Sequence, residues 1–168
     1  MLIRWIPICF VAAAILFGIA DTAVLYHRLP HRIASHFDAQ GHADGWSTKQ
    51  EFVAVAAATV AFVVALFIGV LFVIRIVPFN SINLPNKKYW MAPEREAQTR
   101  RYIENWTLTF AAITLWLLVL IFHDGLAANL RQPTHLEFAW YFLGAYFLVV
   151  IVLLIQLIRR FWRTPQAK

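Results

Sequence analysis

The chain has 168 residues, of which 61% are hydrophobic and only 14% are charged. An average soluble domain carries about 45–50% apolar and about 25% charged residues. This composition excludes a soluble globular domain, a disordered chain and a nucleic-acid-binding module. The lone Cys9 excludes an internal disulfide framework. The chain is therefore expected to be embedded in a lipid bilayer.

Four apolar segments are long enough to cross a bilayer, whose core of about 30 Å needs about 20 helical residues. They cover residues 5–26, 52–77, 106–126 and 138–158. The first resembles a signal peptide, but its apolar run exceeds the roughly 7–15 residues of a signal core, which favours a retained span. The predicted fold class is an all-α integral membrane protein with four transmembrane helices in a left-handed bundle, a single membrane domain over residues 1–168.

The basic residues predict the orientation, because Lys and Arg gather in cytoplasmic loops. With four spans, both termini share one side with the inner loop, residues 78–105. That side holds eleven basic residues: Arg4, Arg75, Lys87, Lys88, Arg95, Arg100, Arg101, Arg159, Arg160, Arg163 and Lys168. The other side holds four: Arg28, Arg32, Lys49 and Arg131. We therefore expect cytoplasmic termini, a bacterial inner-membrane location, and an outward-facing outer loop, residues 27–51.

The histidines divide the opposite way from the basic residues. All six fall on the outer side or at its interface: His27, His31, His36, His42, His123 and His135. An unperturbed histidine titrates near pH 6.5. This segregation is the feature of the sequence most informative about function.

The outer loop contains strong turn and capping signals. Pro30 should keep the first helix from continuing. Asp38 with Gly41 predicts one tight turn, and Asp44-Gly45 predicts a second. At the start of the second span, Ser47 or Thr48 can cap the helix, with Gln50 or Glu51 near its third position.

A recognisable pattern follows the first span directly: Leu29-Pro30, Ile33, His36-Phe37, Gly41, Asp44-Gly45 and Lys49. It resembles a bacterial membrane-protein family with a domain of unknown function (number 1648), which is also the N-terminal domain of SdpI-type immunity and signalling proteins. The inner-loop run Asn83-Leu84-Pro85-Asn86-Lys87-Lys88-Tyr89-Trp90, then Pro93-Glu94, is similar to stand-alone members. The resemblance covers the first two spans, to about residue 79. It implies a family fold without an assigned activity.

The inner loop divides into an irregular part and a helical part. Residues 83–90 hold turn formers, and Trp90 is expected to dip into the membrane interface. Pro93 suits the first turn of a helix. We expect that helix to run over residues 93–105 into the third span. Its basic face should lie beside the lipid headgroups or serve as a docking surface for a cytoplasmic partner.

A candidate ligand cluster lies on the outer side: His31, His36, Asp38, His42 and Asp44, which His123 and Asp124 at the end of the third span could join. Zinc takes three or four such ligands, but the spacing matches no zinc signature. Three interpretations stay open for these residues: a metal site, turn and cap formation, and proton or ligand sensing. No cofactor is predicted.

Asp21 lies inside the first span, where a carboxylate is costly and is a functional hypothesis by default. It should face the other helices, with Arg28 or His123 as its partner. Ala14 and Gly18 lie on the same helix face, which predicts close helix contact there.

The sequence offers no nucleophile elbow and no phosphate-binding loop, so an enzyme is not expected. A metal-dependent membrane enzyme, such as a membrane-embedded metal hydrolase, stays open only if metal analysis finds zinc. The predicted function is a non-enzymatic binding, signalling or immunity-like module acting through the outer histidine-rich loop. The alternative is a small accessory subunit packed against other membrane-protein subunits. Within the loop we expect His36, braced near Asp124, to affect folding more than His31 or His42 does.

Overall fold

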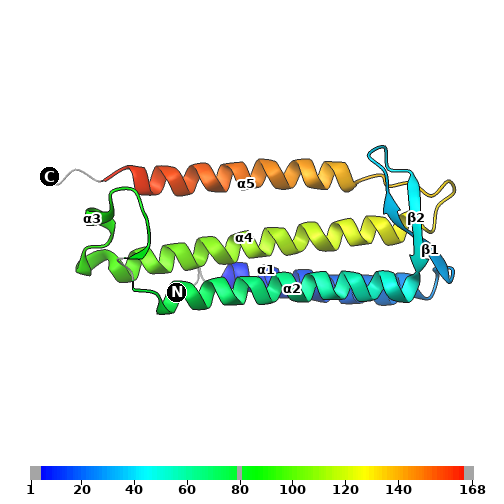
Figure 1. Cartoon of the computed structure of the whole chain (residues 1–168), viewed down its shortest axis with the longest axis horizontal. Coiled ribbons are helices and arrows are strands. Elements are labelled where there is room, and N and C mark those ends of the chain that lie inside the picture. The colour runs from blue at the N-terminus through cyan, green and yellow to red at the C-terminus, as the bar shows by residue number, and fades with distance from the viewer. Residues whose placement is uncertain (1–4, 79–80, 165–168) are drawn as a thin grey trace.

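The structure, a computed structural model, describes residues 5–78 and 81–164. Within those residues, four helices are long and apolar enough to cross a membrane: α1 (Trp5–Tyr26), α2 (Lys49–Ile76), α4 (Pro93–Ala128) and α5 (Ala139–Trp162). The connections contain strands β1 (Arg32–Phe37) and β2 (Ala43–Thr48) and the one-turn helix α3 (Lys87–Trp90) (Figure 1). Arg4 and Lys168, which entered the orientation prediction, lie outside the described residues.

α4 is the central helix, against which α1, α2 and α5 each mainly pack. α5 lies on the opposite side of α4 from α1 and α2 (Figure 1). On α1, Ala14 is fully buried, and a Cβ added at Gly18 would lie 3.2 Å from a methyl carbon of Val119 on α4. The predicted close contact along this face of α1 is therefore confirmed. The left-handed bundle stays a prediction.

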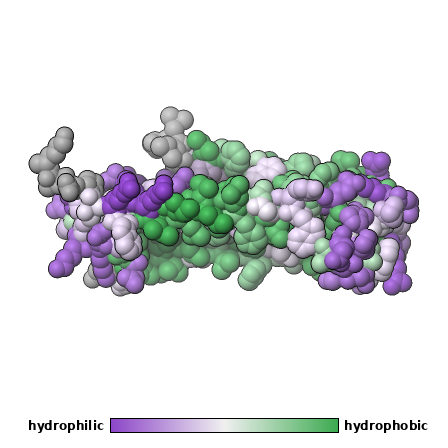
Figure 2. All heavy atoms as spheres, turned by 90° about the horizontal axis from the view of Figure 1, so that it is seen from above, coloured by the Kyte–Doolittle hydropathy of each residue, from purple (hydrophilic) through white to green (hydrophobic). Residues whose placement is uncertain are grey.

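On the face shown in Figure 2, apolar side chains cover the middle of the elongated molecule, and polar side chains gather at both ends. α2 contains no buried residue, and large side chains such as Phe62, Leu66 and Phe72 are more than half exposed. A helix satisfies its backbone hydrogen bonds internally, so such a surface is stable in lipid. The chain is a multi-pass membrane protein.

The outer ends of α1 and α2 are held together by residues around Thr48. Its hydroxyl oxygen accepts the backbone N–H of Glu51 at 3.2 Å, and the Glu51 carboxylate accepts the backbone N–H of Thr48 at 2.9 Å. This capping box confirms the predicted cap and starts α2 earlier than the apolar run alone suggested. The Lys49 ammonium donates to the carbonyl oxygens of Tyr26 and Leu29, at 3.1 Å each, and so closes the end of α1.

α4 is longer than the third predicted span, because the helix predicted over residues 93–105 continues into it without a break. At its inner end, the buried Glu104 carboxylate accepts from Arg75 Nε at 3.1 Å. Arg100 donates to carbonyl groups at the C-terminal end of α2. A cation that we expected beside headgroups therefore holds the end of α2 instead.

The inner loop also departs from the prediction around Trp90. The loop is helical over α3, and the Trp90 side chain is buried instead of lying in the membrane interface. Its indole N–H donates to the carbonyl oxygen of Phe161 at 3.1 Å, near the end of α5. An indole packed on another helix end satisfies its N–H there, which removes the reason to reach the interface.

Candidate functional site

The outer loop folds into an antiparallel hairpin of β1 and β2. The all-α prediction did not include these two strands. His36 lies opposite Gly45, with a register shift on each side of His36. A Cβ added at Gly45 would lie 2.7 Å from the Cβ of His36, so glycine leaves the room that this pair needs. The second turn predicted at Asp44-Gly45 is wrong, because both residues lie within β2.

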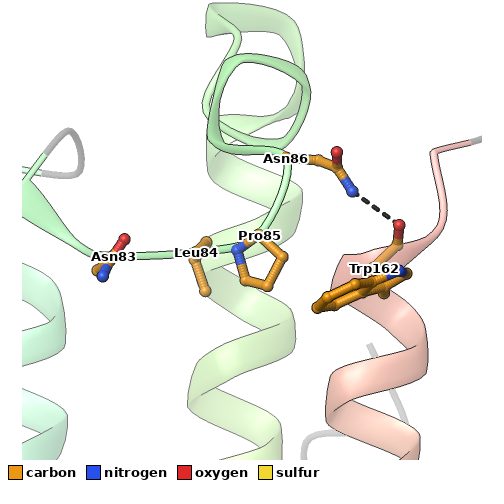
Figure 3. Close-up of a pocket in the computed structure, with 5 residues that line it drawn as sticks. All are labelled: Asn83, Leu84, Pro85, Asn86 and Trp162. Atoms are coloured by element: carbon orange, nitrogen blue, oxygen red, sulfur yellow. Dashed lines mark hydrogen bonds between the residues drawn. The ribbon is translucent and has the colours of Figure 1, made fainter.

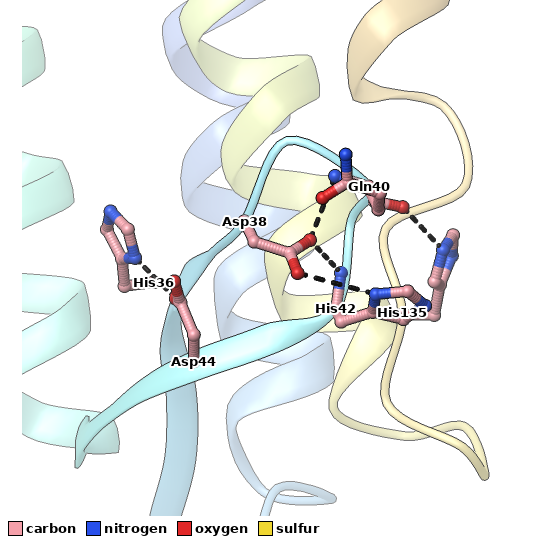
Figure 4. A network of polar contacts seen from close by, with 6 residues as sticks. All are labelled: His36, Asp38, Gln40, His42, Asp44 and His135. Atoms are coloured by element: carbon pink, nitrogen blue, oxygen red, sulfur yellow. Dashed lines mark hydrogen bonds and ion pairs between the residues drawn. The ribbon is translucent and has the colours of Figure 1, made fainter.

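His36 pairs within the hairpin instead of bracing it against α4. Its Nδ1 lies 2.5 Å from the Asp44 carboxylate, and 73% of its side chain is exposed (Figure 4). The predicted brace near Asp124 is therefore wrong. The register shifts on both sides of His36 accompany this pairing of the imidazole with its cross-strand neighbour Asp44.

Asp38 and Gly41 form the turn of the hairpin, as predicted. The Gly41 N–H donates to the Asp38 carbonyl at 3.0 Å, and the φ of Gly41 is 86°, which favours glycine. The Asp38 carboxylate accepts the backbone N–H groups of Gln40 at 2.9 Å and His42 at 2.8 Å. These bonds, above all the one from His42, hold the pKa of Asp38 below its ordinary value.

The turn reaches the connection between α4 and α5 through two histidines. His42 Nδ1 lies 3.4 Å from the Asp38 carboxylate, and the His42 ring stands edge-on to the His135 ring, with centroids 5.3 Å apart. His135 Nε2 lies 2.9 Å from the Gln40 carbonyl oxygen (Figure 4). A backbone bridge also pairs His42 with His135. The hairpin tip and the α4–α5 connection therefore meet at this imidazole pair.

Asn129 docks the base of the hairpin on α4. Its side-chain oxygen accepts the backbone N–H of Ala34 at 2.7 Å, and its amide nitrogen donates to the Ala34 carbonyl at 2.9 Å. Beside it, Leu29, Ile33 and Leu126 form a buried apolar cluster. The Asn129 side chain thus makes the two backbone hydrogen bonds to Ala34 that a neighbouring strand would make. The apolar cluster packs beside it.

Asp124 is almost completely buried beneath the α4–α5 connection. Its Oδ2 accepts the backbone N–H groups of Phe138 and Ala139, both at 2.9 Å. Its Oδ1 lies 3.8 Å from the Arg131 guanidinium, which is closer, at 3.2 Å, to Glu137. A carboxylate from α4 therefore caps the N-terminus of α5, where a helix favours negative charge.

Asp21 finds its partner on α4. Both of its carboxylate oxygens lie 2.9 Å from His123 Nδ1, so His123, and not Arg28, is the partner in the structure. The Asp21 side chain is 14% exposed, and the His123 side chain is 38% exposed. The ring of Phe17 packs beside the imidazole. This pair joins α1 to α4 in the outer half of the bundle.

A groove of about 610 Å³ opens beside this pair, between α1, α2 and α4. The wall from α2 is made of small apolar residues such as Ala56, Ala57 and Ala61. Asp21 and His123 lie among the lining residues of the other two helices. An apolar cavity with a few polar groups suits a lipophilic molecule that carries one hydrogen-bonding group.

The candidate metal ligands are not gathered into one cluster. Within residues 5–78 and 81–164, no three His, Cys, Asp or Glu side chains are arranged to hold a metal ion. The acids and imidazoles instead form separate pairs: His36 with Asp44, His42 with Asp38, and His123 with Asp21. His31 is exposed, and its carbonyl accepts the N–H of Lys49 at 3.0 Å. Paired imidazoles are suited to taking up and releasing protons.

The other residues of the resemblance pattern have structural positions. Leu29 lies in the buried cluster, Pro30 is exposed after α1, and Phe37 pairs with Ala43 across the hairpin. In the inner loop, Asn83 and Pro85 line a hollow beside the end of α5.

Two residues that position the hairpin were missed from the sequence, Asn129 and His135. Each contacts a residue 95 positions away, so no local pattern marks it. The only available signal was that His135 belongs to the same outer group of histidines as His42.

Residues 9–61 match the family model described as Domain of unknown function (DUF1648). The chain therefore contains this domain, which confirms the family suggested by the outer-loop pattern. The match begins in α1, spans the hairpin and ends within α2. The inner-loop run at residues 83–94 lies beyond it, and its resemblance stays a prediction. No curated protein and no solved structure matches the chain.

Proposed function

We propose that this protein is a non-enzymatic binding and signalling module of a bacterial inner membrane, which responds to protons at its outer face through the hairpin. The contact of His42 with His135 carries the proposal, because it links the hairpin tip to the α4–α5 connection through two titratable rings. Exposed pairing of His36 with Asp44 adds a second titratable contact on the same hairpin.

Protonation acts in opposite directions at these two contacts. A charged His36 is attracted more strongly to Asp44, 2.5 Å away. Charged His42 and His135 repel each other, with ring centroids 5.3 Å apart, while the attraction of charged His42 to Asp38, 3.4 Å away, stays within the hairpin tip. Acidification therefore keeps the hairpin closed while loosening its tip from the α4–α5 connection.

Asp38 does not drive this response. Its folded pKa is lowered below the ordinary value of 3.8, so the stability that it contributes is present above that value. This contribution is lost only as the pH falls through the lowered folded pKa. A change between about pH 8 and about pH 5 would therefore not come from Asp38.

The test uses the full chain in lipid nanodiscs, labelled with ¹⁵N-glycine, which gives few signals because the sequence has six glycines. Gly41, next to the His135 ring, and Gly45, opposite His36, are the reporters. From about pH 8 to about pH 5, we expect both amide signals to shift as the neighbouring imidazoles take up protons. Gly69 and Gly144, which have no side-chain neighbours at the Cβ position, should not shift.

A double variant, His42→Gln with His135→Gln, should lose the Gly41 shift and keep the Gly45 shift. The matched control, His27→Gln with His31→Gln, should keep both. Reporters that stay still over the whole range, or a Gly41 shift that survives the first variant, would refute proton sensing. Shifts caused by Zn²⁺ at a fixed pH of about 7.5 would identify a metal site instead.

The predicted orientation, with termini in the cytoplasm, belongs to the same proposal and has a separate test. An Ala39→Cys protein should react with a membrane-impermeant thiol reagent added to intact cells, because residue 39 is exposed at the hairpin tip. A Gln166→Cys protein, changed at a position beyond the described residues, should not react. Each protein carries Cys9→Ala to remove the native thiol. The reverse labelling would place every histidine of the hairpin in the cytoplasm.

A second candidate function is a small accessory subunit of a larger membrane complex. The observation that favours it is α2, which has no buried residue and exposes large apolar side chains such as Phe62 and Phe72 to lipid or to another helix. Purification in mild detergent separates the two functions. A monomer or homo-oligomer supports the sensing module, and a discrete assembly with other polypeptides supports the subunit.

A further inference from the structure

The end of the molecule opposite the hairpin contains a second candidate binding site. A hollow of about 560 Å³ lies between the loop over residues 83–86 and Trp162 at the end of α5 (Figure 3). We propose that this hollow binds the headgroup of an anionic phospholipid. The proposal is independent of proton sensing, because it involves neither the hairpin nor any histidine.

Hydrogen bonds fix the two walls of the hollow relative to each other. The Asn86 amide donates to the carbonyl oxygens of Phe161 at 3.1 Å and Trp162 at 2.7 Å (Figure 3). The buried Trp90 donates to the Phe161 carbonyl as well. Asn86 has a φ of 52°, so the chain turns sharply there into α3. The hollow is therefore formed before any ligand arrives, which lowers the entropy cost of binding.

The surroundings of the hollow are strongly positive. Five exposed cations belong to α3 and to the end of α5: Lys87, Lys88, Arg159, Arg160 and Arg163. The sequence contains no Asp or Glu over residues 80–93 or from residue 138 to residue 168. The acids that follow, Glu94 and Glu96, begin α4, and Glu96 is paired with Arg100. The positive charge of the five cations around the hollow complements the negative charge of a phosphate group.

The position of the hollow at the level of the lipid headgroups favours a lipid over a dissolved anion as its ligand. Trp162 is 71% exposed at the end of a membrane-spanning helix, the position where tryptophan marks the headgroup region. A phosphate in the hollow would accept a hydrogen bond from the amide of Asn83, which lines it, and would be attracted by Lys87 and Lys88, which directly follow Asn86 in the chain. The acyl chains of the bound lipid would then lie along the exposed apolar surface of α5, which includes Leu154 and Ile158.

Binding is tested with the full chain in a neutral detergent at about 0.1 M salt, using a fluorescent phosphatidylglycerol as the probe. We expect saturable binding that unlabelled phosphatidylglycerol displaces, and that phosphatidylcholine and glycerol phosphate do not. The double variant Lys87→Gln with Lys88→Gln should raise the Kd by about tenfold. The matched control, Arg28→Gln with Arg32→Gln, removes the same charge at the other end and should change the Kd less than about twofold.

Three results would overturn the site. Equal weakening by both double variants would mean that only net charge matters. Displacement by phosphatidylcholine would mean that the headgroup is not recognised. Displacement by glycerol phosphate as effective as that by the lipid would identify a site for a soluble anion. Both pairs of substituted residues are exposed, so unchanged helix content by circular dichroism checks that the variants fold.

Discussion

Asp124→Ala is expected to lower the free energy of unfolding by about 3 kcal/mol, because removing the buried carboxylate would leave two backbone N–H groups without an acceptor. Those groups belong to Phe138 and Ala139, and each lies 2.9 Å from the same carboxylate oxygen. The loss falls on α5 in particular, since this carboxylate is the side-chain cap of that helix. Denaturant titration in micelles measures it, and hydrogen exchange over the first turn of α5 locates it.

Asp124→Asn is the matched control. The amide oxygen can still accept both N–H groups, but the charge that favours a helix N-terminus is gone, so a loss of about 1 kcal/mol is expected. Equal losses in the two variants would show that the charge, and not the cap geometry, holds α5. No loss in either variant would contradict the assignment of Asp124 as the cap.

The spans and the cap of α2 were predictable because their determinants are local. A continuous apolar run predicts a helix in lipid wherever the rest of the chain lies, and α1 coincides with the predicted span. The capping box at Thr48 and Glu51 is likewise contained within one turn. The match at residues 9–61 also rests on this contiguous part of the chain.

The hairpin was not predictable, because the contacts that hold it are distant in sequence. β1 reads RIASHF and β2 reads ADGWST, and neither shows a clear alternation of apolar and polar residues. The hairpin is held on α4 by Asn129, which bonds the backbone of Ala34, a buried residue 95 positions earlier. The glycine at position 45 looked like a turn signal, but it serves to make room for His36. A local pattern could not distinguish these two uses.

The partner of Asp21 shows the same limit in one residue. Sequence reasoning left Arg28 and His123 open, because it could not rank a near neighbour in the chain against a residue 102 positions away. Helix packing decides between them. The close approach of α1 to α4 at Gly18 brings the outer half of α1 against α4 and places Asp21 beside His123.

Asp21→Leu is expected to lower the free energy of unfolding by about 1 kcal/mol, the low end of the cost of leaving a buried polar group without its hydrogen-bond partner. The low end applies because His123 is 38% exposed and can regain part of its solvation. Arg28→Leu, at the rejected partner, should change stability by less than about 0.5 kcal/mol. Both are measured by denaturant titration in micelles.

The double variant Asp21→Leu with His123→Leu decides whether the pair or the acid alone matters. If the two side chains stabilise the fold through each other, removing both leaves no unpaired polar group at the groove, and the double variant should be more stable than Asp21→Leu. Additive losses would mean that the 2.9 Å contact contributes no coupling energy. Unchanged stability in Asp21→Leu would mean that the carboxylate is solvated by water or headgroups at the outer end of α1. In that case Asp21 and His123 would not form a stabilising hydrogen bond beside the groove.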